Sequence, residues 1–230
     1  MKNQISVLAI VFLMFSSVLL MGQTRDVGGF HAVHASTSVV VTLVKASSTS
    51  IEYTMKKGSA ENLITKVKNG TLYVKTRSNK GNWGNNNTQA SVTVYYTELD
   101  EVKASAGCTL ISDNTIKAST MEIEVSSGST ATLDVDANEV DVDVSSGATL
   151  KLKGEADKGS FEATSGSTLN AYYFVTNNAD VEASSGASLS IHVNGTLDAE
   201  ANSGASISYT GDPKNKNIDA GWSGSIKRKG

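Results

Sequence analysis

Glycines recur at nearly constant intervals through the second half of the chain. They stand at Gly107, Gly128, Gly147, Gly166, Gly186, Gly204 and Gly224, separated by 21, 19, 19, 20, 18 and 20 residues. Three of them follow a pair of serines, as in Ser126-Ser127. A repeat of this length is too short for a βα unit or a propeller blade. It fits one coil of a solenoid, in which each repeat buries its apolar side only by stacking on the next.

Each glycine lies between two segments in which apolar and polar residues alternate, as in a half-buried strand. Around Gly147, for example, the apolar positions are Val142 and Val144 before it and Leu150 and Leu152 after it. The column five residues before each glycine comprises Val102, Ile123, Val142, Phe161, Val181 and Ala199. We expect these columns to face inward. Each glycine then marks a corner, where either a positive φ or close packing of coils excludes a Cβ.

The pattern predicts an all-β fold, a single-stranded parallel β-helix with coils of about 20 residues, stacked about 4.8 Å apart. Regular β-helix repeats are expected over residues 105–230, and a less regular β region with the first coils over 23–104. The rival for this repeat length is the leucine-rich repeat, whose asparagine ladder and helical segments are missing.

The N-terminal half shows strand patterns without a clean period. Alternating β-branched and aromatic residues predict strands at 30–35, 39–45, 50–55, 63–67, 71–76 and 91–96. Asn69-Gly70 predicts a hairpin turn between two of these strands. A polar loop surrounds Trp83.

Residues 1–22 have the pattern of a secretory signal peptide, with Lys2 before an apolar run that is shorter than the ~20 residues of a spanning helix. The alternative is a membrane anchor. We therefore expect an extracytoplasmic location, in the periplasm, on the outer-membrane surface or secreted, and no transmembrane segment after cleavage. The single cysteine, Cys108, permits no internal disulfide. Removing Lys2 makes the chain slightly more acidic than its net charge of −3, which argues against nucleic-acid binding.

The order of several segments resembles a known family. Residues 25–33, 39–44, 63–74 and 92–99, followed by the serine-glycine repeats, are similar to the putative auto-transporter adhesin head GIN domain family of secreted bacterial proteins. The resemblance covers nearly the whole chain after residue 22. It implies an all-β fold with right-handed β-helical coils, an extracytoplasmic location and no catalytic residues.

Carboxylates form two further columns. Glu124, Asp143, Glu162, Glu182 and Glu200 stand four residues before successive glycines, in a column that begins with Lys103. The column six residues before comprises Glu101, Glu122, Asp141, Ser160, Asp180 and Asp198. Both have outward parity, so they predict an acidic face. This face either binds cations, with Ca²⁺ as the natural ion for oxygen ligands, or is a solvated surface that keeps the rod soluble and prevents lateral strand pairing.

Other candidate sites are few. Trp83 is either a glycan contact or a loop tip without a role, and Trp222 is expected to plug the end of the solenoid. No Gly-x-Ser-x-Gly and no Ser/His/Asp or Cys/His arrangement occurs, and His31, His34 and His192 are the only histidines.

The sequence thus predicts a non-enzymatic, adhesin-like binding or structural solenoid. Its expected partners are a glycan, a cell-surface protein or another copy of itself, and it needs no cofactor beyond weakly bound surface Ca²⁺. The alternatives are a polysaccharide-active enzyme on the same scaffold and a structural polymer of stacked solenoids.

Overall fold

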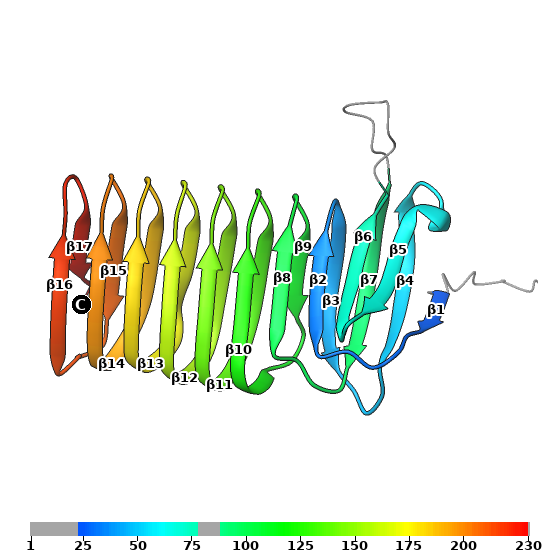
Figure 1. Cartoon of the computed structure of the whole chain (residues 1–230), viewed down its shortest axis with the longest axis horizontal. Helices are drawn as coiled ribbons and strands as arrows, with labels where there is room; N and C mark the ends of the chain where they lie inside the picture. The colour runs from blue at the N-terminus through cyan, green and yellow to red at the C-terminus, as the bar shows by residue number, and fades with distance from the viewer. Residues whose placement is uncertain (1–22, 78–87, 230) are drawn as a thin grey trace, which may run out of the picture.

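The chain winds into an elongated rod of stacked β-coils (Figure 1). The computed structural model describes residues 23–77 and 88–229. The predicted signal peptide and Trp83 lie outside these residues. Strands rise along the front face, turn at the top, descend on the back face and advance toward the C-terminal end. This path is right-handed, as predicted. Over the described ranges, no helix is long and apolar enough to cross a membrane.

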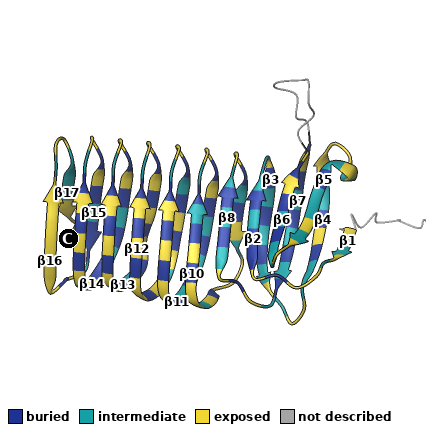
Figure 2. Cartoon of the chain, in the orientation of Figure 1, coloured by how far each residue is buried: buried dark blue, intermediate teal, exposed yellow. Residues whose placement is uncertain are grey.

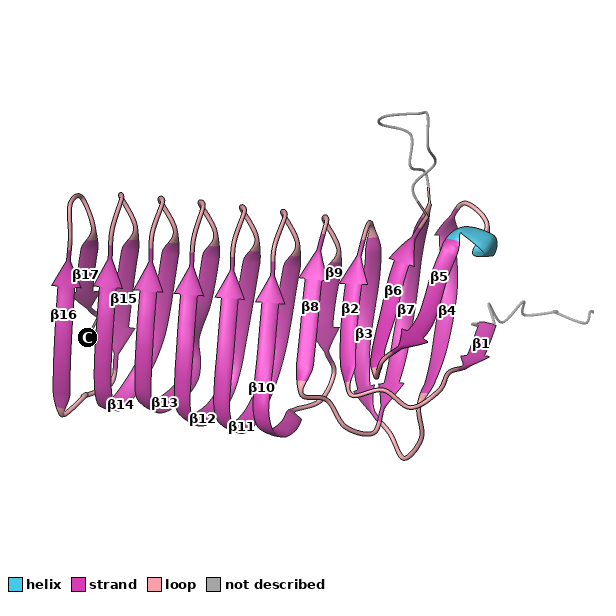
Figure 3. Ribbon diagram, in the orientation of Figure 1, coloured by secondary structure: helices cyan, strands magenta, loops and turns pink. Residues whose placement is uncertain are grey.

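The C-terminal part consists of parallel strands that pair in sequence order. Four of them run down the back face, bend at the bottom and rise along the front face as one long strand (Figure 3). In β11 the bend coincides with Asn138 and Glu139, two consecutive exposed residues that break the alternation of buried and exposed positions. The strands are β10 (Ile116–Val125), β11 (Thr130–Val144), β12 (Thr149–Ala163), β13 (Thr168–Ala183), β14 (Ser188–Ala201), β15 (Ser206–Thr210), β16 (Asn215–Ala220) and β17 (Ser225–Arg228).

The corners are tight turns with two consecutive left-handed residues. At one of them Ser127 has φ 53° and Gly128 φ 69°. The turn closes with a hydrogen bond from the Ser129 N–H to the Ser126 carbonyl, 3.2 Å long. Two positive φ values in a row are typical of a type I′ turn. Successive corners also bond to one another, since the Gly128 N–H donates to the Ser146 carbonyl over 3.1 Å.

Positive φ, and not crowding, explains six of the predicted corner glycines. A Cβ added there would meet no atom within 4 Å, whereas φ lies between 69° and 78°. These residues are Gly107, Gly128, Gly147, Gly166, Gly186 and Gly204.

Gly224 is an exception, and its assignment as a corner residue of the same kind was wrong. The last turn has shifted by one residue, because the Gly224 N–H bonds to the Gly221 carbonyl and Ser223 carries the positive φ of 57°. Gly224 therefore follows the turn and stacks beside Ala205. A Cβ at Gly224 would lie 1.9 Å from the carbonyl oxygen of Ala201, so close packing excludes a side chain there.

The interior is a stack of the predicted apolar columns (Figure 2). Phe161 is 1% exposed, between Val142 and Val181 in the strand register. The column directly after the corner glycine is filled by small buried side chains, which are Cys108, Ser129, Ala148, Ser167, Ala187 and Ala205. Burial raises the pKa of the Cys108 thiol, which fits a packing role.

The N-terminal part supplies the remaining strands, and all six predicted segments form strands there. Asn69 and Gly70, with φ of 52° and 78°, join two antiparallel strands in the predicted hairpin turn. The strands are β1 (Gln23–Asp26), β2 (Ala32–Ser36), β3 (Val39–Lys45), β4 (Ser50–Lys57), β5 (Leu63–Lys68), β6 (Thr71–Thr76), β7 (Gln89–Tyr96), β8 (Glu101–Ser105) and β9 (Thr109–Ser112), with a 3-10 turn η1 (Ala60–Asn62).

The order of layers along the rod differs from the order along the chain. Strand β2 lies between β6 and β8, and β3 lies between β7 and β9, always in parallel. The first coil of the chain is therefore sandwiched between two coils that come later. Antiparallel strands β5 on the front and β4 with β1 on the back complete that end of the rod.

Candidate functional site

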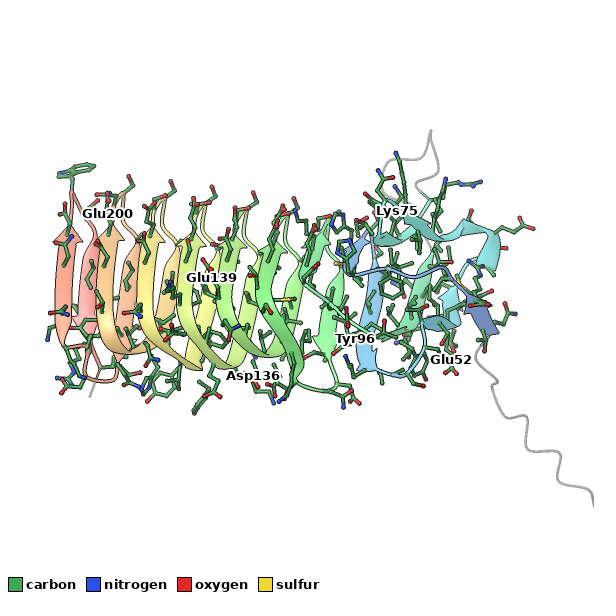
Figure 4. All side chains as sticks on the ribbon, turned by 60° about the horizontal axis from the view of Figure 1, so that its bottom comes forward. Glu52, Lys75, Tyr96, Asp136, Glu139 and Glu200 are labelled. Atoms are coloured by element: carbon green, nitrogen blue, oxygen red, sulfur yellow. The ribbon has the colours of Figure 1, made fainter. Side chains whose placement is uncertain are left out.

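The two carboxylate columns lie in register on the front face. Glu124 pairs with Asp143, Asp143 with Glu162, and Glu182 with Glu200. The second column runs parallel, with Glu122 beside Asp141 and Asp180 beside Asp198. We call these residues the acidic strip: Glu101, Glu122, Glu124, Asp141, Asp143, Glu162, Asp180, Glu182, Asp198 and Glu200. Figure 4 shows the outward side chains in rows along the rod, with Glu200 near its C-terminal end.

Like charges perturb the middle of the acidic strip. The pKa of Asp143 lies above its usual range because the carboxyl is partly buried and because Glu124 and Asp141 are close. The pKa of Glu162 is raised by partial burial, with further contributions from Asp143 and Glu182. Both carboxyls are thus harder to ionise in the folded chain than in a free peptide.

Lys103 neutralises the N-terminal end of the strip. Its Nζ lies 2.7 Å from Glu122, 3.1 Å from Glu101 and 3.5 Å from Glu124. The hydrogen bond to Glu122 is the main reason that the pKa of Lys103 lies above its usual range. His34 Nε2 also lies 2.5 Å from Glu101. The sequence placed Lys103 at the head of the column but did not show that it contacts three carboxylates.

Burial acts to raise the pKa of Glu101, but hydrogen bonds from His34 and Lys103 outweigh it, so that this pKa lies below its usual range. The uncompensated negative charge of the strip therefore lies between Asp141 and Glu200. A shallow depression of about 250 Å³ opens where this stretch meets the carboxylates paired with Lys103, and it is lined by Glu122, Glu124, Asp141, Asp143, Ser160 and Glu162 with Ile123. Within residues 23–77 and 88–229, no group of three or more His, Cys, Asp or Glu side chains is arranged to hold a metal ion.

The exposed aromatic side chains differ from those expected from the sequence. Trp222 is 90% exposed at the last corner, so the expectation that it plugs the end of the solenoid was wrong. Tyr172 and Tyr173 project from the back face, and Tyr173 is 75% exposed. The sequence signal that could have indicated this pair is the interval between glycines. It is 20 residues from Gly166 to Gly186, which contains the pair, and 19 residues in each of the two preceding intervals.

The histidines engage polar groups other than serine hydroxyls. His31 Nδ1 lies 2.8 Å from Asp100, and His192 Nε2 lies 3.2 Å from Asn194. His34 bonds to Glu101, as described above. None of these pairs has the serine or cysteine nucleophile that acyl-transfer chemistry would require.

Several solved structures share this fold. A putative adhesin from Bacteroides fragilis NCTC 9343 is 18% identical, and the alignment covers 91% of this chain and 96% of that one with a TM-score of 0.79. A putative lipid binding protein from Parabacteroides distasonis ATCC 8503 is 19% identical, with 90% and 96% covered and a TM-score of 0.70. A putative adhesin from the same Parabacteroides strain is 13% identical, with 90% and 96% covered and a TM-score of 0.72.

The sequence comparison is more specific than the fold. No curated protein matches the chain. The sequence pattern described as "Putative auto-transporter adhesin, head GIN domain" matches residues 29–213, which span the inserted first coil, the irregular end and nearly all of the regular coils. The matched region contains every residue of the acidic strip and the tyrosine pair. The chain therefore belongs to the putative auto-transporter adhesin family, of which it is a head GIN domain.

Proposed function

We propose that this chain is a non-enzymatic, adhesin-like solenoid that acts outside the cytoplasmic membrane and binds its partner through its long flat faces. The observation that carries the proposal is the acidic strip, in which carboxylates from successive coils stand in register on an exposed face. Such a surface suits an extended partner with repeated groups better than a small substrate. Family membership and the adhesin descriptions of two relatives support the same function.

The acidic strip gives this surface a chemical preference. Its free carboxylates between Asp141 and Glu200 attract cations, and Ca²⁺ favours oxygen ligands. A flat row cannot surround an ion, so each Ca²⁺ would keep much of its water and bind weakly. We propose that such ions bridge the strip to carboxylates or hydroxyls of a glycan or cell-surface protein.

Binding of the purified chain to a glycan array and to bacterial and animal cells, with Ca²⁺ or with NaCl at equal ionic strength, tests this function. We expect Ca²⁺-dependent binding that is lost in the triple variant Glu162→Gln, Asp180→Asn, Glu182→Gln. The matched control removes three carboxylates outside the strip, with Glu52→Gln, Glu61→Gln and Glu98→Gln, and should bind normally. Equal loss in both triple variants, no binding to any surface, or turnover of an arrayed polysaccharide would contradict the proposal.

A further inference from the structure

One coil of the rod contains extra residues on its back face. The interval from Gly166 to Gly186 is 20 residues, against 19 for the coil before it and 18 for the coil after it. The strand register accommodates the difference by bulging: Lys151 pairs with Asn170, but Lys153 pairs with Tyr173. Against the following strand, β14, Ala171 pairs with Ile191, and the next pair is Val175 with His192, so that the residues between Ala171 and Val175 bulge out of the register. Bulges of this kind re-aim side chains and are common beside functional sites.

The bulge points two neighbouring aromatic residues outward. Consecutive strand residues normally face opposite sides, yet Tyr172 and Tyr173 are both exposed. Their rings form an edge-to-face pair with centroids 4.9 Å apart. The Tyr172 N–H donates to Asn170 Oδ1 over 3.3 Å. Phe174, which follows them, is fully buried and packs edge-to-face on Phe161, with centroids 6.1 Å apart. The tyrosine pair thus rests on a fixed part of the core.

A groove lined by polar groups adjoins the pair. Asn170 also lines a groove of about 260 Å³ that runs toward the C-terminal end with Ser190, Ser208 and Lys227. Ser190 Oγ donates to Asn170 Oδ1 over 3.3 Å. In the preceding coil, Lys153 stands beside Tyr173 in the strand register, and its Nζ lies 2.9 Å from Asp134. The end of the groove thus carries positive charge at Lys227, whereas the charge of Lys153 is paired with Asp134.

We propose that Tyr172, Tyr173 and the adjoining groove form a binding site for an acidic oligosaccharide. A pyranose ring has an apolar C–H face that matches the negative face of an aromatic ring. The hydroxyl and amide groups of Asn170, Ser190 and Ser208 suit the sugar hydroxyls. Lys227 and Lys229, which line the end of the groove, suit carboxylate or sulfate groups of the oligosaccharide. The site deepens the proposed adhesive function and rests on it, but it lies on the opposite face from the acidic strip.

A protein partner fits this patch less well than a sugar chain. The core of a stable protein interface is a larger apolar area in which several hydrophobic anchors cluster. Here a single aromatic pair adjoins serine and asparagine side chains and the Lys153–Asp134 ion pair. The neighbouring outward column consists of hydroxyl residues in register, which are Thr109, Thr130, Thr149, Thr168, Ser188, Ser206 and Ser225. Rows of hydroxyls offer hydrogen bonds to an extended polar ligand.

The test uses the purified protein with hexagalacturonate and with the neutral hexamer of N-acetylglucosamine as probes, in calorimetry or tyrosine fluorescence. We expect hexagalacturonate to bind, and Tyr173→Ala to weaken its binding by about tenfold or more. Lys227→Gln should weaken hexagalacturonate binding but leave any binding of the neutral hexamer unchanged. Trp222→Ala, which removes an even more exposed aromatic side chain from a corner, is the control and should bind normally. Circular dichroism and the melting temperature identify any variant that fails to fold.

The results separate this site from the proposed function. Binding to cells that survives Tyr173→Ala, together with absent binding of both hexamers, would overturn the oligosaccharide site and leave adhesion by the front face intact. Cell binding that is lost in Tyr173→Ala but resists periodate oxidation of the cell-surface glycans would assign the tyrosine pair to a protein partner and likewise overturn the proposal. Loss of cell binding in Tyr173→Ala and after periodate treatment would support it.

Discussion

The corner residues show how local backbone conformation sets the repeat. Each regular corner needs two left-handed residues, which glycine adopts without strain and serine adopts at a cost. Ser127, Ser146, Ser165, Ser185 and Ser203 all have φ between 52° and 54°. Glycine at the second position was predictable from its spacing. The left-handed serine before it was not, because the sequence contains serines at many ordinary positions as well.

Replacing a corner glycine isolates the conformational cost. Gly166 has φ 69°, and an added Cβ would meet nothing within 4 Å. Gly166→Val should therefore lower the free energy of unfolding by about 1–3 kcal/mol through backbone strain alone. Gly166→Asn is the control, since asparagine tolerates this region, and should cost much less. Thermal or urea unfolding measures both, and an unchanged stability of the valine variant would contradict the role assigned to the corner.

At the scale of strands, alternation specified the inward columns, but the packing inside them depends on neighbours. Two phenylalanines, Phe161 and Phe174, share one level of the core. Gly159 makes room for them, because a Cβ there would lie 2.3 Å from the Phe161 ring. Gly154, in register with Phe174, has φ 115° and would place a Cβ 2.0 Å from the Val135 carbonyl oxygen. The inward parity of Phe161 followed from the sequence, whereas its pairing with Phe174 depends on a bulge that alternation cannot reveal.

Truncation of Phe161 tests this packing. Phe161→Ala should destabilise the rod by about 3–5 kcal/mol, because it leaves a cavity in a buried column. Gly159→Ala should also be destabilising, since the added methyl group overlaps the Phe161 ring. The double variant should cost less than the sum of the two single variants, because the alanine at 159 then has free space. Additive losses, measured by chemical unfolding, would contradict the contact.

At the scale of the whole molecule, negative charge gathers on the front face, whereas the back face carries carboxylates and lysines in ion pairs. The front face carries the acidic strip, and its positive partner Lys103 sits at one end. The register of the strip followed from the glycine spacing, because residues at equal offsets from stacked corners must lie beside each other. The insertion of β2 and β3 between later coils could not be predicted, since it joins segments far apart in sequence that have no repeat in common.

The acidic strip should make stability depend on pH. The pKa values of Asp143 and Glu162 are higher in the folded state than in the unfolded chain. The folded state thus binds more protons just above their ordinary pKa values of 3.8 and 4.5, so stability falls as pH rises through that window and remains lower at neutral pH. Asp143→Asn should therefore raise the melting temperature at pH 7.5, and by less at pH 5. Glu61→Gln, in the 3-10 turn, serves as the control.

Salts test the same repulsion on the unaltered chain. CaCl₂ should raise the melting temperature at pH 7.5 more than NaCl at equal ionic strength, because a divalent ion can bridge neighbouring carboxylates. The difference should shrink in the variant with Glu162→Gln, Asp180→Asn and Glu182→Gln. Identical melting curves in the two salts would leave the strip as a solvated face that keeps the rod soluble.

The position of the first coil has a consequence for how the chain acquires its structure. Strands β2 and β3 have their partners in β6 to β9, so the N-terminal layer is complete only when the chain as far as Ser112 is available. After that point each coil needs only the one before it, and assembly can proceed toward the C-terminus one coil at a time. A chain that emerges from a ribosome or a membrane pore would thus form no complete layer until about its first half has emerged. The rod would then grow by one coil each time enough further residues emerge.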